Sequence, residues 1–227
     1  MKNSNIADLI GKKFKTKLGE LPVLELLGKG KSGYSYLTKH DHKYYVLKIM
    51  HDEPCSYYSF DQNKVELEVK AYNKLIDYSI LMPELICYDL ENEYLVKEFI
   101  DGKTASEIIA NDLISEAIIQ QLFEIYRQVK QNRLNIDYFP ANFIIKDQRL
   151  FYIDYECNQY SSEWNLPSWG LYYWANCEGF KNFLSTDDST YINESTENGI
   201  PIKKPFENKV SAWLQKFDVG WSKFIEN

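Results

Sequence analysis

The pattern of apolar residues changes once along this chain, and that change limits the folds open to it. Residues 19–50 contain short apolar runs, rich in β-branched and aromatic residues, that are separated by turns, as is typical of antiparallel strands. Residues 104–132 instead place isoleucine, leucine and valine at helical spacing among charged side chains. The two patterns meet near residues 97–102. We therefore expect an α+β fold, with an antiparallel sheet in the first part and a mainly helical second part.

Further elements are expected in the first part. Residues 61–78 have apolar side chains at helical spacing behind Asp61, which can cap the start of a helix. Short strands are expected around residues 83–90 and 93–100, which flank an acidic turn. The first part is thus an antiparallel sheet with one helix.

The second part contains two interruptions of the helical pattern. We expect a break at residues 111–113, where the sequence reads Asn-Asp-Leu. Residues 185–205 are polar and rich in turn residues, so a mobile loop is expected there. A last amphipathic helix is expected around residues 206–217.

Composition argues against several classes of partner. The formal net charge is -7, which speaks against nucleic acid or an anionic membrane as the main partner, because phosphate groups bind basic surfaces. The four cysteines form no CxxC pair, so reduced thiols are expected rather than a zinc site or disulfides. No apolar run is long enough for a signal peptide or a membrane span. We expect a cytoplasmic protein.

Two carboxylates and one amide stand at the ends of two short apolar runs in residues 132–156. Asp137 and Asn142 precede the first run, and Asp154 follows the second. Two strands joined by a tight polar turn bring their outer ends together, so these side chains are expected to converge. Such residues also serve as turn formers or helix caps. Three oxygen donors at one point are typical of a site for a hard metal ion.

Histidine is absent from that stretch. The chain has three histidines, which are His40, His42 and His51. The segment Lys39–Lys43 holds two of them and is expected to be a solvated hairpin turn, because two metal ligands from a turn need others nearby. Any general base near Asp137 or Asp154 is therefore expected to be a carboxylate.

Gly28, Gly30 and Gly33 form a GxGxxG motif. A dinucleotide-binding turn needs a helix after it, whereas residues 34–39 are strand-like. We therefore interpret the motif as a turn between antiparallel strands. Its backbone amides can approach phosphate groups, because glycine has no side chain.

Lys48 lies in the next expected strand. A lysine in such a place commonly extends its ammonium group to the surface. The helix expected after it offers Glu66 and Glu68, and a carboxylate from either can pair with a buried ammonium group and direct it at a phosphate.

These features together resemble the protein-kinase-like superfamily, in the branch that contains aminoglycoside phosphotransferases and choline-kinase-like enzymes. The resemblance covers about residues 20–160 and rests on five motifs in register, GKGKSG, VLKI, ELEVKAYNKL, NIDYFPANFII and FYIDYE. It implies two lobes of one domain, residues 1–98 and 99–227, with ATP in the cleft. By this resemblance, Lys48 matches the lysine that contacts the α- and β-phosphates, with Glu68 as its expected partner and Glu66 as the reserve.

The resemblance also implies the chemistry. Asp137 matches the catalytic aspartate, which accepts the proton of the substrate hydroxyl, and Asn142 and Asp154 match the two magnesium ligands. Such a chain is an enzyme that transfers the γ-phosphate of Mg-ATP to a hydroxyl acceptor. A nucleotide-binding pseudokinase with a scaffolding role is the alternative.

Several positions depart from the family pattern. Asn135 replaces the usual histidine before the catalytic aspartate, and Ile136 replaces the arginine found in many protein kinases. Phe139 is neither the lysine of serine/threonine protein kinases nor the histidine common in small-molecule kinases. Tyr155 and Glu156 stand where protein kinases have phenylalanine and glycine. We therefore expect a small hydroxylated acceptor, with a serine/threonine protein kinase as the alternative.

Aromatic residues gather after the last motif. Trp169 and Tyr173 lie four positions apart, which places both on one face of a helix. Such a pair is usually part of the core, and the alternative is an aromatic box for a cationic amine. Residues 156–176 are rich in aromatic and amide groups that can line a small pocket.

Overall fold

The computed structural model describes residues 8–53, 62–196 and 199–218. The chain divides into two compact units, one formed by Met1–Lys74 with Pro83–Ile100 and the other by Leu75–Met82 with Asp101–Asn227. The predicted boundary after residue 98 lies close to the last of these divisions. Residues 75–82, which the prediction placed in the first part, belong to the second unit.

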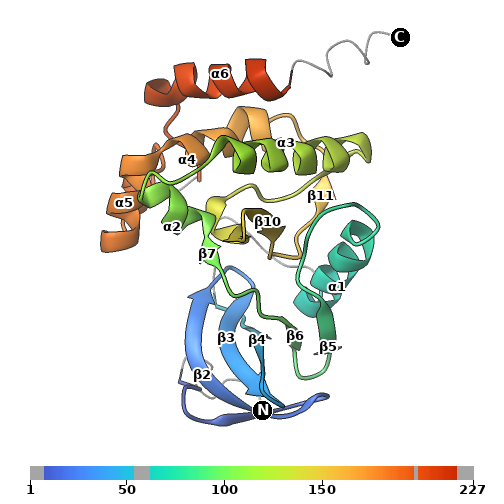
Figure 1. Ribbon diagram of the computed structural model, residues 1–227. Coiled ribbons are helices and arrows are strands. Elements are labelled where there is room, and N and C mark those ends of the chain that lie inside the picture. Colours follow the sequence, from blue (N-terminus) through green and yellow to red (C-terminus); the bar gives the residue numbers. More distant parts are fainter. Residues whose placement is uncertain (1–7, 54–61, 197–198, 219–227) are drawn as a thin grey trace. The chain divides into compact units, whose positions relative to one another are not determined.

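An antiparallel six-stranded sheet forms most of the first unit, in the order β1-β2-β3-β4-β6-β5. Its strands are β1 (Lys13–Thr16), β2 (Gly19–Lys29), β3 (Gly33–His40), β4 (Lys43–Met50), β5 (Leu85–Asp89) and β6 (Tyr94–Glu98). Figure 1 shows β2, β3 and β4 side by side. The predicted strands are confirmed, and β1 is an additional strand in a lysine-rich segment that did not indicate one.

Side chains of alternate residues form the core of this sheet. The buried members are Leu21, Val23, Tyr34, Tyr36, Leu47, Ile49, Tyr94 and Val96. Between β3 and β4, Asp41 and His42 have φ angles of 44° and 69°, and two positive φ angles are what a tight two-residue hairpin requires. Both residues are exposed, so the predicted solvated turn is confirmed.

Helix α1 (Lys64–Leu75) is shorter than the predicted range of residues 61–78. Asn63 caps its start, because the Asn63 Oδ1 atom accepts the N–H of Glu66 at 3.1 Å. Asp61, the predicted cap, lies outside the described residues. A small core cluster beside the helix consists of Met50, Val65, Val69 and Leu95.

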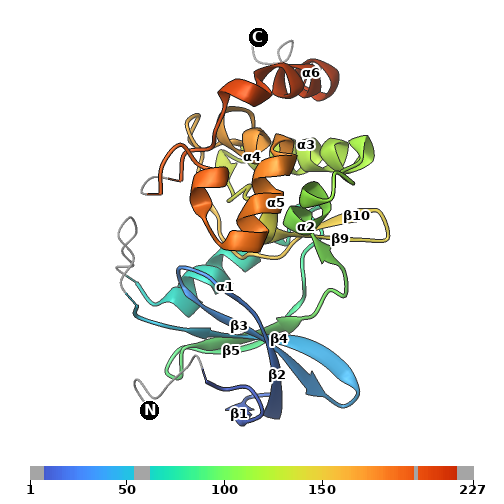
Figure 2. The same ribbon diagram turned by 90° about the vertical axis from the view of Figure 1, so that its left-hand side faces the viewer.

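Helices dominate the second unit. They are α2 (Ala105–Ala110), α3 (Glu116–Gln131), α4 (Leu171–Ala175), α5 (Cys177–Thr186) and α6 (Glu207–Phe217). Short strands are β7 (Lys103–Thr104), β8 (Leu134–Asn135), β9 (Phe143–Lys146), β10 (Arg149–Tyr152) and β11 (Asn158–Gln159). Single turns are η1 (Pro140–Asn142), η2 (Leu166–Gly170), η3 (Ser189–Tyr191) and η4 (Lys204–Phe206). Figure 2 shows α2 next to β9.

The predicted break between the first two helices of this unit is confirmed. A side-chain cap marks the start of each of the two helices. Thr104 and Glu107 form a reciprocal capping box at the start of α2. Ser115 caps α3 by accepting the N–H of Ile118. The predicted last helix is also confirmed, as α6.

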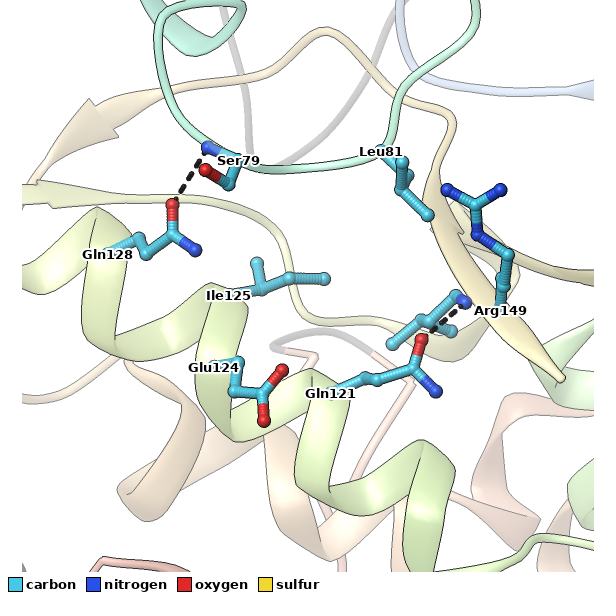
Figure 3. A pocket seen from close by; sticks show the side chains of 8 residues that line it. Ser79, Leu81, Gln121, Glu124, Ile125, Gln128 and Arg149 are labelled. Carbon is cyan, nitrogen blue, oxygen red and sulfur yellow. Dashed lines mark hydrogen bonds between the residues drawn. The ribbon is translucent and has the colours of Figure 1, made fainter.

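Residues 75–82 join the second unit through hydrogen bonds and a buried side chain. The Ser79 N–H donates to Gln128 Oε1 on α3 at 2.9 Å, as Figure 3 shows. The Tyr152 N–H donates to the Leu81 carbonyl at 2.9 Å, and Ile80 is only 7% exposed. A cavity of about 270 Å³ beside this segment is lined by Ser79, Leu81, Gln121, Glu124, Ile125, Gln128, Arg149 and Leu150. None of the predicted site residues lines it.

The segment predicted as a mobile loop has points of attachment. It contains η3 and an antiparallel bridge between Asn193 and Pro201. The Tyr173 hydroxyl lies 2.6 Å from Asn193 Oδ1 and 2.8 Å from the Gly199 carbonyl oxygen. The described part of residues 185–205 is therefore tied to α4.

Two other expectations concern chain chemistry. Among the described residues, no helix is long and apolar enough to cross a membrane. Cys87, Cys157 and Cys177 carry free thiols, whereas Cys55 lies outside the described residues.

Candidate functional site

Lys48 forms a buried ion pair with Glu68 in the first unit. Lys48 Nζ, on β4, lies 2.5 Å from Glu68 Oε1, on α1, and the two side chains are 8% and 9% exposed. Glu66 instead pairs with Lys70 at 2.9 Å on a more exposed part of α1. Of the two candidates, Glu68 is therefore the partner of Lys48. A buried ammonium group needs such a partner because removing a lone charge from water is costly.

The Glu68 carboxylate also contacts the glycine-rich turn. Ser32 Oγ donates to Glu68 Oε1 at 3.1 Å. The other oxygen, Oε2, is buried and receives no hydrogen bond from the described residues. An unsatisfied buried acceptor costs free energy. A further donor to Glu68 Oε2 would therefore be stabilising.

The three glycines of the motif have different surroundings. A Cβ atom at Gly28 would have no neighbour within 4 Å, and one at Gly30 would lie 3.9 Å from the Gly33 carbonyl oxygen. A Cβ atom at Gly33 would lie 2.6 Å from the carbonyl oxygen of Ile49 on β4. Gly33 is therefore required by the close approach of two strands, whereas Gly28 and Gly30 leave open space beside the backbone.

In the second unit, the hairpin of β9 and β10 places Asn142 and Asp154 close to each other. The strands pair antiparallel with Phe143 opposite Tyr152. Just beyond that pair, the Ile153 N–H donates to the Asn142 carbonyl at 2.9 Å. The predicted hairpin is thus present, and its open end holds both candidate metal ligands.

Asp137 lies in the loop before η1, where side chains form hydrogen bonds with the backbone of the same segment. Asp137 Oδ1 accepts the N–H of Phe139 at 2.9 Å. Asn142 Nδ2 donates to the Asp137 carbonyl at 3.4 Å. The first contact orients the Asp137 carboxylate. The second engages the amide nitrogen of Asn142, so that its oxygen Oδ1 is the atom suited to bind a cation.

The buried hydroxyl of Tyr152 lies near the carboxylates of Asp137, Asp154 and Glu156. Tyr152 is fully buried, and its Oη donates to the Glu156 carbonyl at 3.0 Å. Burial raises the pKa of Tyr152 well above its ordinary value, and the charges of Asp154, Glu156 and Asp137 raise it further. Tyr152 therefore stays protonated. Its hydroxyl is a fixed donor that joins the end of β10 to the backbone at Glu156.

Packed side chains hold the loop around Asp137. Trp174 Nε1 donates to the Tyr138 carbonyl at 2.9 Å in a buried contact. A Cβ atom at Gly170 would lie 2.6 Å from Tyr138 Cβ, so glycine is required there. Asn135 donates from Nδ2 to the Trp164 carbonyl at 2.7 Å. The loop is thus held without an imidazole ring at residue 135.

A series of aromatic rings begins beside Asp137. Phe139 contacts Tyr173, Tyr173 contacts Trp169 and Trp169 contacts Trp164, with centroid distances of 5.1, 4.9 and 5.9 Å. Tyr173 is buried, Trp169 is half-buried and Trp164 is 40% exposed. Burial raises the pKa of Tyr173, and the charge of Asp137 raises it further. One end of the series is therefore core and the other end is surface.

The donors at the open end of the hairpin suit a magnesium ion. In the ranges that the structure describes, no group of three or more His, Cys, Asp and Glu side chains is arranged to hold a metal. The predicted ligand set differs from such a group, because it combines the Asp154 carboxylate with the Asn142 amide oxygen. Magnesium commonly retains several waters and binds one or two carboxylates together with substrate phosphates. The two donors fit that chemistry.

Three residues of these groups were not predicted. Ser32 bonds Glu68, Tyr152 lies among the carboxylates, and His51 Nε2 lies 3.0 Å from the Gly30 carbonyl oxygen. Ser32 belongs to the GxGxxG motif and His51 directly follows β4, so their positions were visible in the sequence. Their partners depend on strand register, which the sequence pattern leaves open.

Comparison of the sequence with protein-family models and with curated proteins finds no match. A functional assignment therefore depends on the residue geometry of the two units.

Alanine substitution should separate the glycines by their effect on stability. Gly33→Ala is expected to lower the free energy of unfolding by about 1–3 kcal/mol, because the added methyl group forces β3 and β4 apart. Gly28→Ala is the matched control and should change it by less than about 0.5 kcal/mol. Urea unfolding followed by circular dichroism measures both, and equal effects would contradict the distinction.

The ion pair should show strong coupling. Lys48→Met alone is expected to lower the free energy of unfolding by about 3–5 kcal/mol, because it leaves the Glu68 carboxylate buried without its cation. The double variant with Glu68→Leu should recover much of that loss, since no charge then remains buried. A double-mutant cycle from urea unfolding tests this. A double variant no more stable than Lys48→Met would disprove the coupling.

Proposed function

We propose that this chain has a protein-kinase-like fold and transfers the γ-phosphate of ATP to the hydroxyl group of a small acceptor. The observation that carries the proposal is the open end of the β9–β10 hairpin, where Asn142 and Asp154 adjoin the Asp137 loop. In the first unit, the buried Lys48–Glu68 pair supports it. These residues follow one another along the chain in the order that the resemblance implies.

The first unit supplies groups for the phosphates of the nucleotide. The Glu68 carboxylate fixes the Lys48 ammonium group in one position, which suits a lysine that contacts the α- and β-phosphates. The open space beside Gly28 and Gly30 suits a backbone that approaches phosphate oxygens closely.

The second unit supplies groups for a cation. Asn142 and Asp154 would hold a magnesium ion through one amide oxygen and one carboxylate. When bound, such an ion neutralises negative charge on the phosphate oxygens. The Ile153 N–H holds the backbone at Asn142 close to the backbone next to Asp154 by its bond to the Asn142 carbonyl.

Asp137 is the proposed catalytic base. The acceptor oxygen attacks the γ-phosphorus and forms a new P–O bond, while the bond from that phosphorus to the β,γ-bridging oxygen breaks. The electron pair of the broken bond leaves with ADP, and the hydroxyl proton passes to the Asp137 carboxylate. The Phe139 N–H orients this carboxylate, so positioning provides part of the catalysis.

The aromatic series supports a small acceptor. Its rings extend from Phe139, two residues from Asp137, to the exposed Trp164. Aromatic faces with nearby amides and carboxylates are suited to sugars, amino alcohols or related hydroxylated compounds. The Tyr155 and Glu156 departures from the protein-kinase pattern agree with that class of acceptor.

Removing the carboxylate of Asp154 should abolish magnesium-dependent nucleotide binding. In a thermal-shift assay, wild type is expected to be stabilised more by ATP with magnesium than by ATP with chelator. Asp154→Ala should lose this difference, whereas Asp77→Ala, which removes an exposed carboxylate elsewhere in the second unit, should keep it. Equal magnesium-dependent shifts in wild type and Asp154→Ala would refute the assignment.

Substituting the proposed base should reduce turnover and spare binding. Acceptor-dependent ADP release is measured with sugars, amino alcohols, nucleosides and aminoglycosides, beside a generic protein substrate. With an active acceptor, Asp137→Asn should lower kcat by about 10²–10⁴, the range expected for a positioned base, and leave ATP affinity unchanged.

Two outcomes of this screen would count against the proposal. Transfer to serine or threonine in protein, without any active small acceptor, would identify a protein kinase. ATP binding without turnover on any acceptor would favour a pseudokinase.

A further inference from the structure

His51 uses both ring nitrogens to bind the backbone of the first unit. The Glu53 N–H donates to His51 Nδ1 at 3.1 Å, so Nδ1 is the unprotonated acceptor nitrogen. The ring proton must then lie on Nε2, which donates to the Gly30 carbonyl at 3.0 Å. The side chain is buried, with the residue only 7% exposed.

Further contacts fix His51 itself. Its N–H donates to the Ser32 carbonyl at 3.1 Å, and Lys64 Nζ on α1 bonds its carbonyl oxygen. The ring packs edge-on against Tyr34, with centroids 5.1 Å apart. Tyr34 Oη in turn donates to Glu53 Oε1 at 2.6 Å. His51 thus connects β3, α1 and both sides of the glycine-rich turn.

The hydrogen bond from His51 fixes the directions of the Gly30 carbonyl and of the N–H that follows it. In a planar trans peptide the C=O and the following N–H point in opposite directions. With the Gly30 carbonyl directed at the His51 ring, the N–H of residue 31 is directed to the opposite side of the turn. A glycine-rich turn can otherwise rotate such a peptide at low cost. A rotated peptide would present a carbonyl oxygen where an N–H had been, and that oxygen repels phosphate.

We propose that His51 is a positioning residue that holds the Gly30–Lys31 peptide in the orientation that favours the phosphate chain of a nucleoside triphosphate. This rests on the proposed function. His51 acts through the turn and touches no reacting atom. Its effect should therefore fall on binding of the phosphates and hardly at all on the rate of transfer.

Two substitutions separate the two hydrogen bonds of the ring. His51→Gln can place an amide N–H near the Nε2 position and keep the donor to Gly30. His51→Asn can place an oxygen near the Nδ1 position, which keeps the acceptor for Glu53 and loses the bond to the turn. The pair therefore differs in the contact that the proposal requires.

Dissociation constants for Mg-ATP and for adenosine test the role. His51→Asn is expected to weaken Mg-ATP binding roughly tenfold, about the effect of losing one hydrogen bond, and to leave adenosine binding within about threefold. His51→Gln should bind both within about threefold of wild type. In turnover, KM for ATP should rise in His51→Asn while kcat stays within about threefold.

Nucleotide-free measurements add an independent readout. Nitrogen NMR of the wild-type ring should show the proton on Nε2, and the amide resonance of residue 31 should shift in His51→Asn while it stays near its wild-type position in His51→Gln. A proton on Nδ1, or unchanged ATP affinity in His51→Asn while wild type binds ATP, would overturn the positioning role alone. So would an equal loss of ATP and adenosine binding, which indicates general destabilisation. If wild type binds no nucleotide, the proposed function itself fails.

Discussion

The buried ion pair between Lys48 and Glu68 constrains how β4 and α1 of the first unit can pack. An isolated charge in the interior would cost several kcal/mol, so β4 and α1 must stay in the register that joins Nζ to Oε1. Ser32 adds the glycine-rich turn to this pair. The order of the turn is therefore partly a consequence of charge burial, because the carboxylate that satisfies the lysine also binds the turn.

The second unit depends on a different constraint, the pairing of two four-residue strands. The β9–β10 register sets Asn142 beside Ile153, and the following residue is Asp154. Tyr152 ends the pairing with its ring in the core. Its protonated hydroxyl is a neutral group near three carboxylates, and it joins the end of β10 to the backbone at Glu156.

The sequence predicted those parts of the fold that local patterns control. Helix α3, the hairpin turns and the convergence of Asn142 with Asp154 follow from periodicity and turn chemistry. Strand β1 was missed because two lysines make its sequence look exposed, although Phe14 is half-buried and Thr16 is buried. His51 and Ser32 were missed because their hydrogen bonds join residues that are distant in sequence. Residues 75–82 were misplaced because a segment that continues a helix has no local signal for the core that it joins.

That last segment has a consequence for how the chain can be divided. The polypeptide passes between the two units after residues 74, 82 and 100. A fragment ending at residue 98 would carry Leu75 and Ile80, which are 0% and 7% exposed in the intact chain, without the core that covers them. The complementary fragment would lack Leu81, whose carbonyl binds the backbone of Tyr152. Exchange of one unit for a foreign counterpart at a single crossover would separate residues 75–82 from the core that they pack against. The two units are therefore expected to be inherited together.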